Sequence, residues 1–427
     1  MSFHPVSVPL ILNNTASSST LGYEDANLPP KVENLSVIET YTNRTIFLTG
    51  ATGFVGKVIL EKILRSTPDV RKIFVLVRPR KGQKPQQRLR EEVLASPIFG
   101  TLRSLRSDFD QWVETKVVAI AGELTVDNVG ICPEDMAALL AELDIVIHCA
   151  AVVDFNERLD RAIQLNTLGS LRMLEIAKKA DHCGAFVHVS TCYVNSNRPF
   201  GEIEEKLYPL GFEPEELIEK VSKMSNSELD TIVSTGILRN WPNTYTMTKS
   251  MAEHLIVKNR GDLPVVIVRP SIVGCSFSEP VPGWVDVISA AGAVYTAMGM
   301  GVIKFLQGSP KNIGDVIPVD YVVNAILVAI PVIFNQRKKY FVCHSASSSE
   351  NPMCWGYPLD SVQKYFAANP PPRAIGPAVF SFARTPQMYQ LRFFLEYSIP
   401  SSILNTLSLT GSQSYKKKAQ LFEKLQW

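Results

Sequence analysis

The sequence lacks the excess of basic residues that nucleic-acid-binding proteins carry, because its formal net charge over 427 residues is only +2. It also lacks the cysteine patterns of zinc sites. Its seven cysteines are dispersed singly, with no Cys-x-x-Cys pair and no Cys/His cluster at ligand spacing. We therefore expect no metal and no nucleic acid, and we expect buried thiols in a reducing intracellular compartment.

Long apolar runs are also lacking. Residues 285–303 contain only one charge, Asp286, but they are rich in glycine and alanine. Residues 322–334 are interrupted by Asn324 and Pro331 and are too short to cross a hydrocarbon core of about 30 Å. Both stretches are expected to be buried elements rather than membrane spans.

Strand-like and helix-like segments alternate from residue 44 to about residue 345. Short apolar, β-branched runs predict strands at 46–48, 73–77, 117–120, 145–148, 186–189 and 265–268. Helical periodicity predicts helices at 55–65, 86–95, 134–142, 160–179 and 245–258. This alternation predicts an α/β fold with a doubly wound parallel sheet of the Rossmann type and right-handed crossovers.

Composition divides the chain into three parts. Residues 1–40 have no secretory signal, are rich in Asn, Ser, Thr and Pro from residue 13, and are expected to form a flexible extension. Residues 41–345 form the α/β domain, in which the acidic stretch 201–240 is interpreted as a loop-like insertion over the site. Residues 346–427 form a small, mostly helical region that ends in a helix-like stretch at 415–427.

A glycine-rich turn follows the first predicted strand. Residues 49–56 read Thr-Gly-Ala-Thr-Gly-Phe-Val-Gly, with glycines at 50, 53 and 56. Glycine lets the chain turn tightly and approach a pyrophosphate, and the first N–H groups of the next helix point at the anion. A turn with only a structural role would have the same local pattern, so the surrounding residues have to distinguish it from a dinucleotide-binding loop.

The end of the second strand indicates which cofactor binds. An NAD site usually has a carboxylate there, but this chain has Arg78, 22 residues after Gly56, with Arg80 and Arg88 nearby. Guanidinium groups bind phosphate through paired, charge-assisted hydrogen bonds, which favours NADPH over NADH. The alternative is that Arg78 is an ordinary surface cation.

Tyr245 and Lys249 lie four residues apart at the start of a predicted helix, so their side chains share one face. A nearby ammonium group favours the phenolate, so we expect Lys249 to lower the pKa of Tyr245 and make it an acid–base group. Lys249 could also hold the nicotinamide ribose. The Tyr-x-x-x-Lys pattern occurs by chance in many helices and gains weight only beside a dinucleotide loop.

Two adjacent hydroxyls, Ser190 and Thr191, end the fifth predicted strand. Either could hydrogen-bond the substrate oxygen beside Tyr245, or the pair could simply cap the strand. The small residues 149–151 end the fourth strand, where a cofactor could lie against the backbone, and Asn166 is expected behind the site.

These motifs together resemble the extended short-chain dehydrogenase/reductases, and more closely the alcohol-forming fatty acyl-CoA reductases. The similarity extends over residues 40–425. Its strongest elements are T-G-A-T-G-F-V-G at 49–56, V-L-V-R at 75–78, H-V-S-T-C-Y at 188–193, P-N-T-Y-T-M-T-K at 242–249 and V-R-P-S-I-V-G at 268–274.

The resemblance implies NADPH-dependent reduction of long-chain acyl-CoA to a primary fatty alcohol through a bound aldehyde, as in wax ester or ether lipid synthesis. It implies Thr191, Tyr245 and Lys249 as the catalytic residues. The cofactor-binding residues implied are Thr49, Gly50, Thr52, Gly53, Phe54, Val55, Gly56, Arg78, Arg88, Tyr245 and Lys249. Residues 346–427 then correspond to the first part of the longer carboxy-terminal region of such reductases. The protein is expected to be cytoplasmic, or peripheral on the endoplasmic reticulum or peroxisome membrane.

Other functions remain open on the sequence. A thioester reductase could stop at the aldehyde, and another extended reductase or a sugar-nucleotide epimerase could use the same motifs. A protein that binds NADPH as a sensor, without turnover, would not need Tyr245, Lys249 and Thr191.

Overall fold

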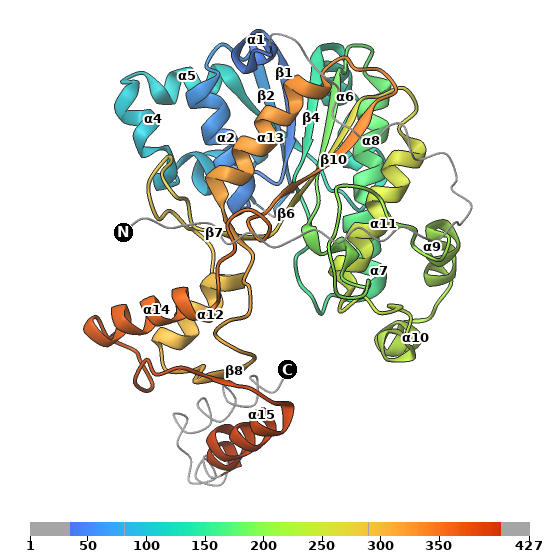
Figure 1. Ribbon diagram of the computed structural model, residues 1–427. Helices are drawn as coiled ribbons and strands as arrows, with labels where there is room; N and C mark the ends of the chain where they lie inside the picture. Colours follow the sequence, from blue (N-terminus) through green and yellow to red (C-terminus); the bar gives the residue numbers. More distant parts are fainter. Residues whose placement is uncertain (1–34, 81, 289, 403–427) are drawn as a thin grey trace.

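A seven-stranded, all-parallel sheet forms the centre of the computed structural model, which describes residues 35–80, 82–288 and 290–402 (Figure 1). The strands are ordered β10-β6-β5-β4-β1-β2-β3. Their bounds are β1 Thr45–Thr49, β2 Lys72–Val77, β3 Val117–Ala121, β4 Leu143–His148, β5 Ala185–Val189, β6 Val265–Pro270 and β10 Tyr340–Ser345. This order confirms the doubly wound fold. The edge strand β10 has no counterpart among the predicted strands.

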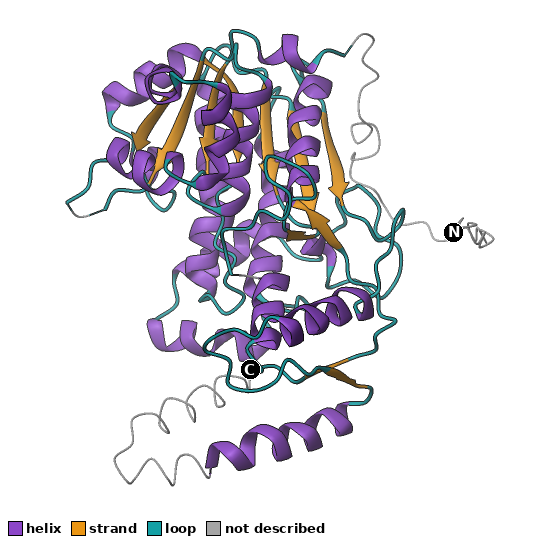
Figure 2. Cartoon of the chain, turned by 90° about the vertical axis from the view of Figure 1, so that its left-hand side faces the viewer, coloured by secondary structure: helices purple, strands orange, loops and turns teal. Residues whose placement is uncertain are grey.

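Helices cover both faces of the sheet (Figure 2). Alternate residues of each strand face opposite sides, so Ile46 and Leu48 pack toward α2 and α13 while Phe47 packs toward α8. The sheet-domain helices are α1 Val37–Tyr41, α2 Phe54–Ser66, α3 Pro85–Arg88, α4 Gly100–Leu105, α5 Phe109–Lys116, α6 Pro133–Glu142, α7 Leu159–Ala162, α8 Gly169–Lys179, α11 Thr244–Asn259 and α13 Val319–Ile333. The apolar stretch 322–334 lies mainly in α13, which buries one face, including Val323 and Ile330, and exposes Val328 on the other. Among the described residues, none of the helices has both the length and the apolar character needed to cross a bilayer.

The acidic insertion 201–240 is not simply a loop, contrary to the prediction. It contains helices α9 Pro214–Ser222 and α10 Asn226–Thr231. Leu217 and Val221, one turn apart on α9, are buried with Trp241, which explains why the segment is helical despite its acidic composition.

A lobe of small elements lies beyond the carboxyl ends of the sheet strands (Figure 1). It contains α12 Ala290–Gly299, α14 Gly356–Ala368, α15 Pro386–Phe393 and the paired strands β8 Phe305–Gln307 and β11 Ser381–Ala383. A second pair, β7 Ile272–Gly274 and β9 Val316–Pro318, continues directly from β6. Because α12 and β8 precede residue 345, the lobe is built from two separate segments of the chain.

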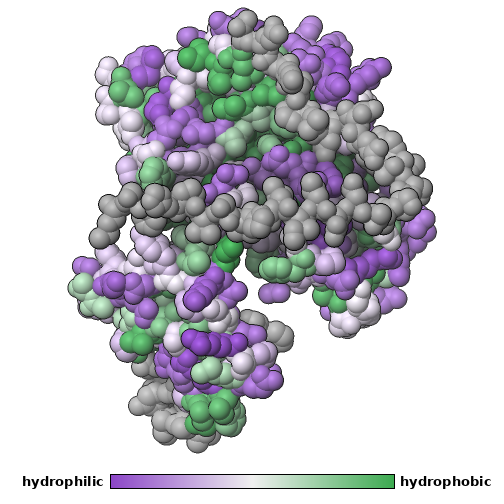
Figure 3. Space-filling view, in the orientation of Figure 1, coloured by the Kyte–Doolittle hydropathy of each residue, from purple (hydrophilic) through white to green (hydrophobic). Residues whose placement is uncertain are grey.

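The last described helix, α15, carries exposed apolar side chains that include Leu391, and Phe394 follows directly after it. Figure 3 shows a green, apolar patch at the bottom of the molecule, in the region of α15. The helix predicted at 415–427 and most of the predicted amino-terminal extension lie outside the described residues.

Candidate active site

The glycine turn between β1 and α2 is shaped so that two of its glycines cannot be replaced without moving backbone. Gly50 has φ of 81°, and a Cβ on it would lie 2.8 Å from the backbone N of Ala150. A Cβ on Gly56 would lie 2.1 Å from the carbonyl O of Gly50. The turn is therefore pressed against the end of β4, and the first turn of α2 is pressed against the turn.

This geometry fits the pyrophosphate of a dinucleotide. The amino terminus of the 13-residue helix α2 has no side-chain cap at Gly53, so the N–H groups of Phe54 and Val55 have no intrahelical partner. Those groups lie beside the crevice between β1 and β4, where the strand order reverses. A helix amino terminus at such a switch point is an anion site.

Thr49 contributes to this loop through the strands. Its fully buried hydroxyl lies 2.8 Å from Nδ1 of His148 and accepts a hydrogen bond from the N–H of Ala150 at 3.1 Å. It therefore ties β1 to the end of β4, whereas Thr52 and Gly53 are accessible on the turn.

The two predicted arginines lie together at the carboxyl end of β2. Nη1 of Arg88 donates to the carbonyl O of Arg78 at 2.7 Å. Arg78 is 62% exposed, and its Nε lies 2.8 Å from Oε2 of Glu123. Glu123 was not among the predicted site residues. The available signal was its position two residues after β3, whose carboxyl end lies beside that of β2.

Helix α11 presents Tyr245 and Lys249 toward the end of β5. Asn243 begins the helix, because its Oδ1 accepts a hydrogen bond from the N–H of Thr246 at 2.9 Å. Nζ of Lys249, which is almost fully buried, donates to the carbonyl O of Val189 at 2.7 Å. This bond holds the helix against the strand that leads into Thr191.

The side chain of Thr191 lies close enough to Tyr245 to lower the pKa of the phenol, and its Oγ1 accepts a hydrogen bond from the N–H of Tyr193 at 3.3 Å. Ser190 is also buried, but its Oγ has no hydrogen-bond partner among the described residues. Of the two adjacent hydroxyls, the structure therefore brings Thr191 to the phenol.

The predicted lowering of the pKa of Tyr245 by Lys249 is wrong for this structure. Burial raises the pKa of Tyr245 above its ordinary value, the neighbouring Cys149 raises it further, and the hydrogen bond with Thr191 lowers it only in part. Desolvation disfavours the phenolate more than the surrounding groups favour it. Tyr245 is consequently protonated at neutral pH and is prepared to donate a proton.

Lys249 and two histidines share the buried space behind the phenol. Burial lowers the pKa of Lys249 to about 8. Burial, together with the charge of Lys249, lowers the pKa of His148 to about 3 and that of His188 well below its usual range. The two imidazoles stack with centroids 5.6 Å apart. Both are neutral, so Lys249 carries the positive charge at this point.

A fully buried ion pair lies farther along the same face of α11. Glu253, four residues after Lys249, accepts from Nε of Arg269 at 2.9 Å and from its Nη2 at 2.6 Å. Each side chain is only 1% exposed. Glu253 and Arg269 were not predicted to form a pair. The available signal was the i, i+4, i+8 spacing of Tyr245, Lys249 and Glu253.

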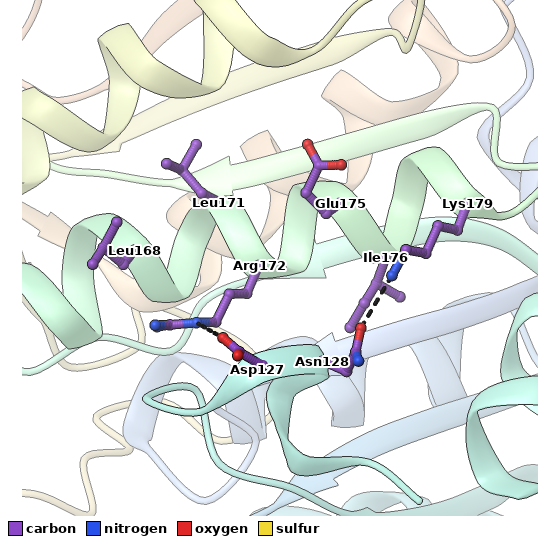
Figure 4. A pocket seen from close by; sticks show the side chains of 8 residues that line it. All are labelled: Asp127, Asn128, Leu168, Leu171, Arg172, Glu175, Ile176 and Lys179. Carbon is purple, nitrogen blue, oxygen red and sulfur yellow. Dashed lines mark hydrogen bonds and ion pairs between the residues drawn. The ribbon is translucent and has the colours of Figure 1, made fainter. Parts of the chain in front are cut away.

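A separate surface hollow lies between α8 and the turn Asp127–Gly130 (Figure 4). Lys179 donates to Asn128 across it at 3.0 Å, and Arg172 lies 4.0 Å from Asp127. None of its eight lining residues is a predicted site residue. The hollow is therefore separate from the predicted site residues.

Comparison with known proteins gives two kinds of similarity. The sequence profile of the family described as Male sterility protein, an NAD-binding profile, matches residues 48–326. Fatty acyl-CoA reductase 1 of Xenopus laevis is 37% identical over 379 residues, 88% of this chain and 72% of the relative. Fatty acyl-CoA reductase 1 of Homo sapiens is 35% identical over 379 residues, with the same two shares.

Among solved structures, the chain is similar to the terminal R domain from the myxalamid PKS-NRPS biosynthetic pathway. The TM-score is 0.56 with 23% sequence identity, and the match covers 96% of this chain and 84% of that domain. At 23% identity this similarity supports the assignment of the fold and nothing beyond it.

Proposed function

Because the chain belongs to the fatty acyl-CoA reductase family, we propose that it reduces long-chain acyl-CoA with NADPH to a primary fatty alcohol through a bound aldehyde. Family membership makes it a reductase that uses a nicotinamide cofactor and takes acyl-CoA as its substrate class. The long acyl chain, the choice of NADPH, the alcohol product and the roles of individual residues are the further parts of the proposal.

The observation that carries the proposal is the placement of Thr191 beside Tyr245 at the carboxyl edge of the sheet, with Lys249 of the same helix bonded to the end of β5. Thr191 and Tyr245 both end in hydroxyl groups that can donate to a carbonyl oxygen. The raised pKa of Tyr245 keeps its proton in place until negative charge develops on the substrate.

NADPH, when bound, supplies hydride to the carbonyl carbon in each of two rounds. In the first round, Tyr245 and Thr191 hydrogen-bond the oxygen of the thioester as it becomes negative, and the C–S bond breaks as that oxyanion collapses to the aldehyde. In the second, Tyr245 gives its proton to the alkoxide oxygen. Lys249, whose ammonium group donates to the carbonyl O of Val189, is the residue that would hold the nicotinamide ribose. Overall, acyl-CoA, two NADPH and two protons give the alcohol, CoA and two NADP⁺.

The choice of NADPH rests on Arg78 and Arg88. They lie at the carboxyl end of β2, next to β1 and its glycine turn, where a dinucleotide fold places the adenosine ribose. The exposed guanidinium of Arg78 can pair with a 2′-phosphate while Glu123 holds it in place.

The test is to incubate the purified chain with palmitoyl-CoA and NADPH, count both reactants and identify the product by mass. We expect two NADPH consumed for each CoA released, together with hexadecanol. A ratio of one, with hexadecanal as the product, would instead identify a thioester reductase that stops at the aldehyde.

Tyr245→Phe is the matched variant, since it removes only the phenol oxygen. We expect it to lower kcat by at least about a hundredfold, as loss of a general acid does, while the Kd for NADPH stays unchanged. Substantial remaining activity would contradict the role of Tyr245.

A further inference from the structure

Two large apolar side chains are exposed on the loop that follows β4. Val153 is 63% exposed and Phe155 is 57% exposed. The ring centroid of Phe155 lies 5.9 Å from that of Tyr245, so the two rings are in contact. One apolar side chain of this loop therefore lies directly against the proposed proton donor.

The loop is clamped at both ends by buried polar side chains. Asn166 receives a hydrogen bond from the N–H of Val152 at 2.9 Å and donates to its carbonyl O at 3.1 Å. At the other end, the hydroxyl of Thr244 donates to the carbonyl O of Glu157 at 2.9 Å. Thr244 is the residue before Tyr245, so the loop and the phenol are held by the same turn of helix α11.

The clamps make the exposure of Val153 and Phe155 a fixed feature of the site. A loose loop could fold these side chains away from water, but this one is held on both sides of them. Single exposed apolar residues are common on protein surfaces and need no explanation. These two differ because the loop leads from the β1/β4 crevice to the phenol, where the reacting carbonyl has to lie.

We propose that Val153 and Phe155 form the apolar wall against which the acyl chain lies when its carbonyl reaches Tyr245. The inference rests on the proposed function and names the residues that recognise the chain. Only the thioester oxygen needs the polar groups of Thr191 and Tyr245. The methylene groups beside it gain free energy from contact with an apolar ring and a valine side chain.

Phe155→Ala tests this wall with palmitoyl-CoA as substrate and free CoA as product inhibitor. CoA has the nucleotide and the thiol but no acyl chain. We expect the KM for palmitoyl-CoA to rise about tenfold, with the Ki for CoA and the Kd for NADPH unchanged. Phe155→Leu, which keeps an apolar side chain, should recover most of the loss.

The control variant is Leu105→Ala on α4, which removes a side chain that is 69% exposed away from the site, and it should leave all three constants unchanged. Equal losses for palmitoyl-CoA and CoA, a fall in kcat alone, or no change would overturn the assignment of Phe155 while the proposed function stands. If the unaltered chain reduces no acyl-CoA, the proposed function fails and the wall fails with it.

Discussion

Lys249 is the single residue whose titration should control activity near neutral pH. Burial lowers its pKa to about 8, whereas Tyr245 stays protonated well above that pH. We expect kcat/KM for NADPH to be level below about pH 8 and to fall above it, as the ammonium group proposed to hold the nicotinamide ribose loses its charge. A pH–rate profile of the unaltered chain measures this.

The same pKa shift acts on stability in the opposite sense. An unfolded lysine titrates near about 10.4, so between about pH 8 and that value the unfolded chain binds the extra proton at Lys249. This group therefore makes the folded state more stable as the pH rises, and it cannot cause unfolding there.

Lys249→Arg keeps a positive charge throughout this range, so the fall of kcat/KM near pH 8 should disappear in this variant. If it persists in that variant, another group controls the profile.

Arg78 should determine the preference between the two cofactors. We expect Arg78→Ala to raise the Kd for NADPH by about tenfold or more and to change the Kd for NADH little, because only NADPH has the 2′-phosphate. Titration of cofactor fluorescence measures both constants.

The paired carboxylate offers the matched control for this prediction. Glu123→Gln removes the negative charge 2.8 Å from Nε of Arg78 but keeps an amide oxygen that can accept from Nε and hold the guanidinium in place, so NADPH should bind at least as tightly as before. Equal weakening of NADPH and NADH by Arg78→Ala would remove the phosphate-binding role.

Among the helices and strands, α11 and β6 are joined by the least exposed charges of the site. Tyr245, Lys249 and Glu253 lie on one face of α11, and Glu253 binds Arg269 of β6. Glu253→Gln leaves the guanidinium buried without its counter-charge. We expect the free energy of unfolding to fall by about 3–5 kcal/mol, measured by urea denaturation.

Glu219→Gln is the control for that measurement. It breaks the ion pair between Glu219 of α9 and Lys223, which directly follows α9. This pair also joins a carboxylate to a cation, but both side chains are exposed. Exposed pairs contribute little, so stability should barely change. If both variants lose similar, small amounts of stability, the buried pair does not lock α11 to the sheet.

At the scale of the whole molecule, the sheet order assembles the site. The glycine turn, the loop after β4, the end of β5 and the start of α11 are far apart in the sequence, yet all lie at the carboxyl edge of the sheet (Figure 1). Parallel strands place all their carboxyl ends on one edge, and the reversal between β1 and β4 opens the crevice there.

Patterns within short segments allowed much of this to be predicted. All six predicted strands lie within observed strands, which extend at most two residues farther at an end, as β4 and β6 do. The glycine turn was also found, since a tight turn into a helix has its own local residue preferences. Tyr245 and Lys249 could be paired because four residues is one helical turn.

By itself, therefore, the sequence determined the alternation of strands and helices, the glycine turn and the position of Arg78 at the end of the second strand. It also determined that Tyr245 and Lys249 share one helix face. Each of these features depends on residues close together in the chain. Only the tertiary structure decided that Thr191 meets the phenol, that burial raises the pKa of Tyr245, that Glu253 finds Arg269, and that Phe155 lies against the phenol ring. Those features depend on burial and on contacts between distant segments, which no local pattern records.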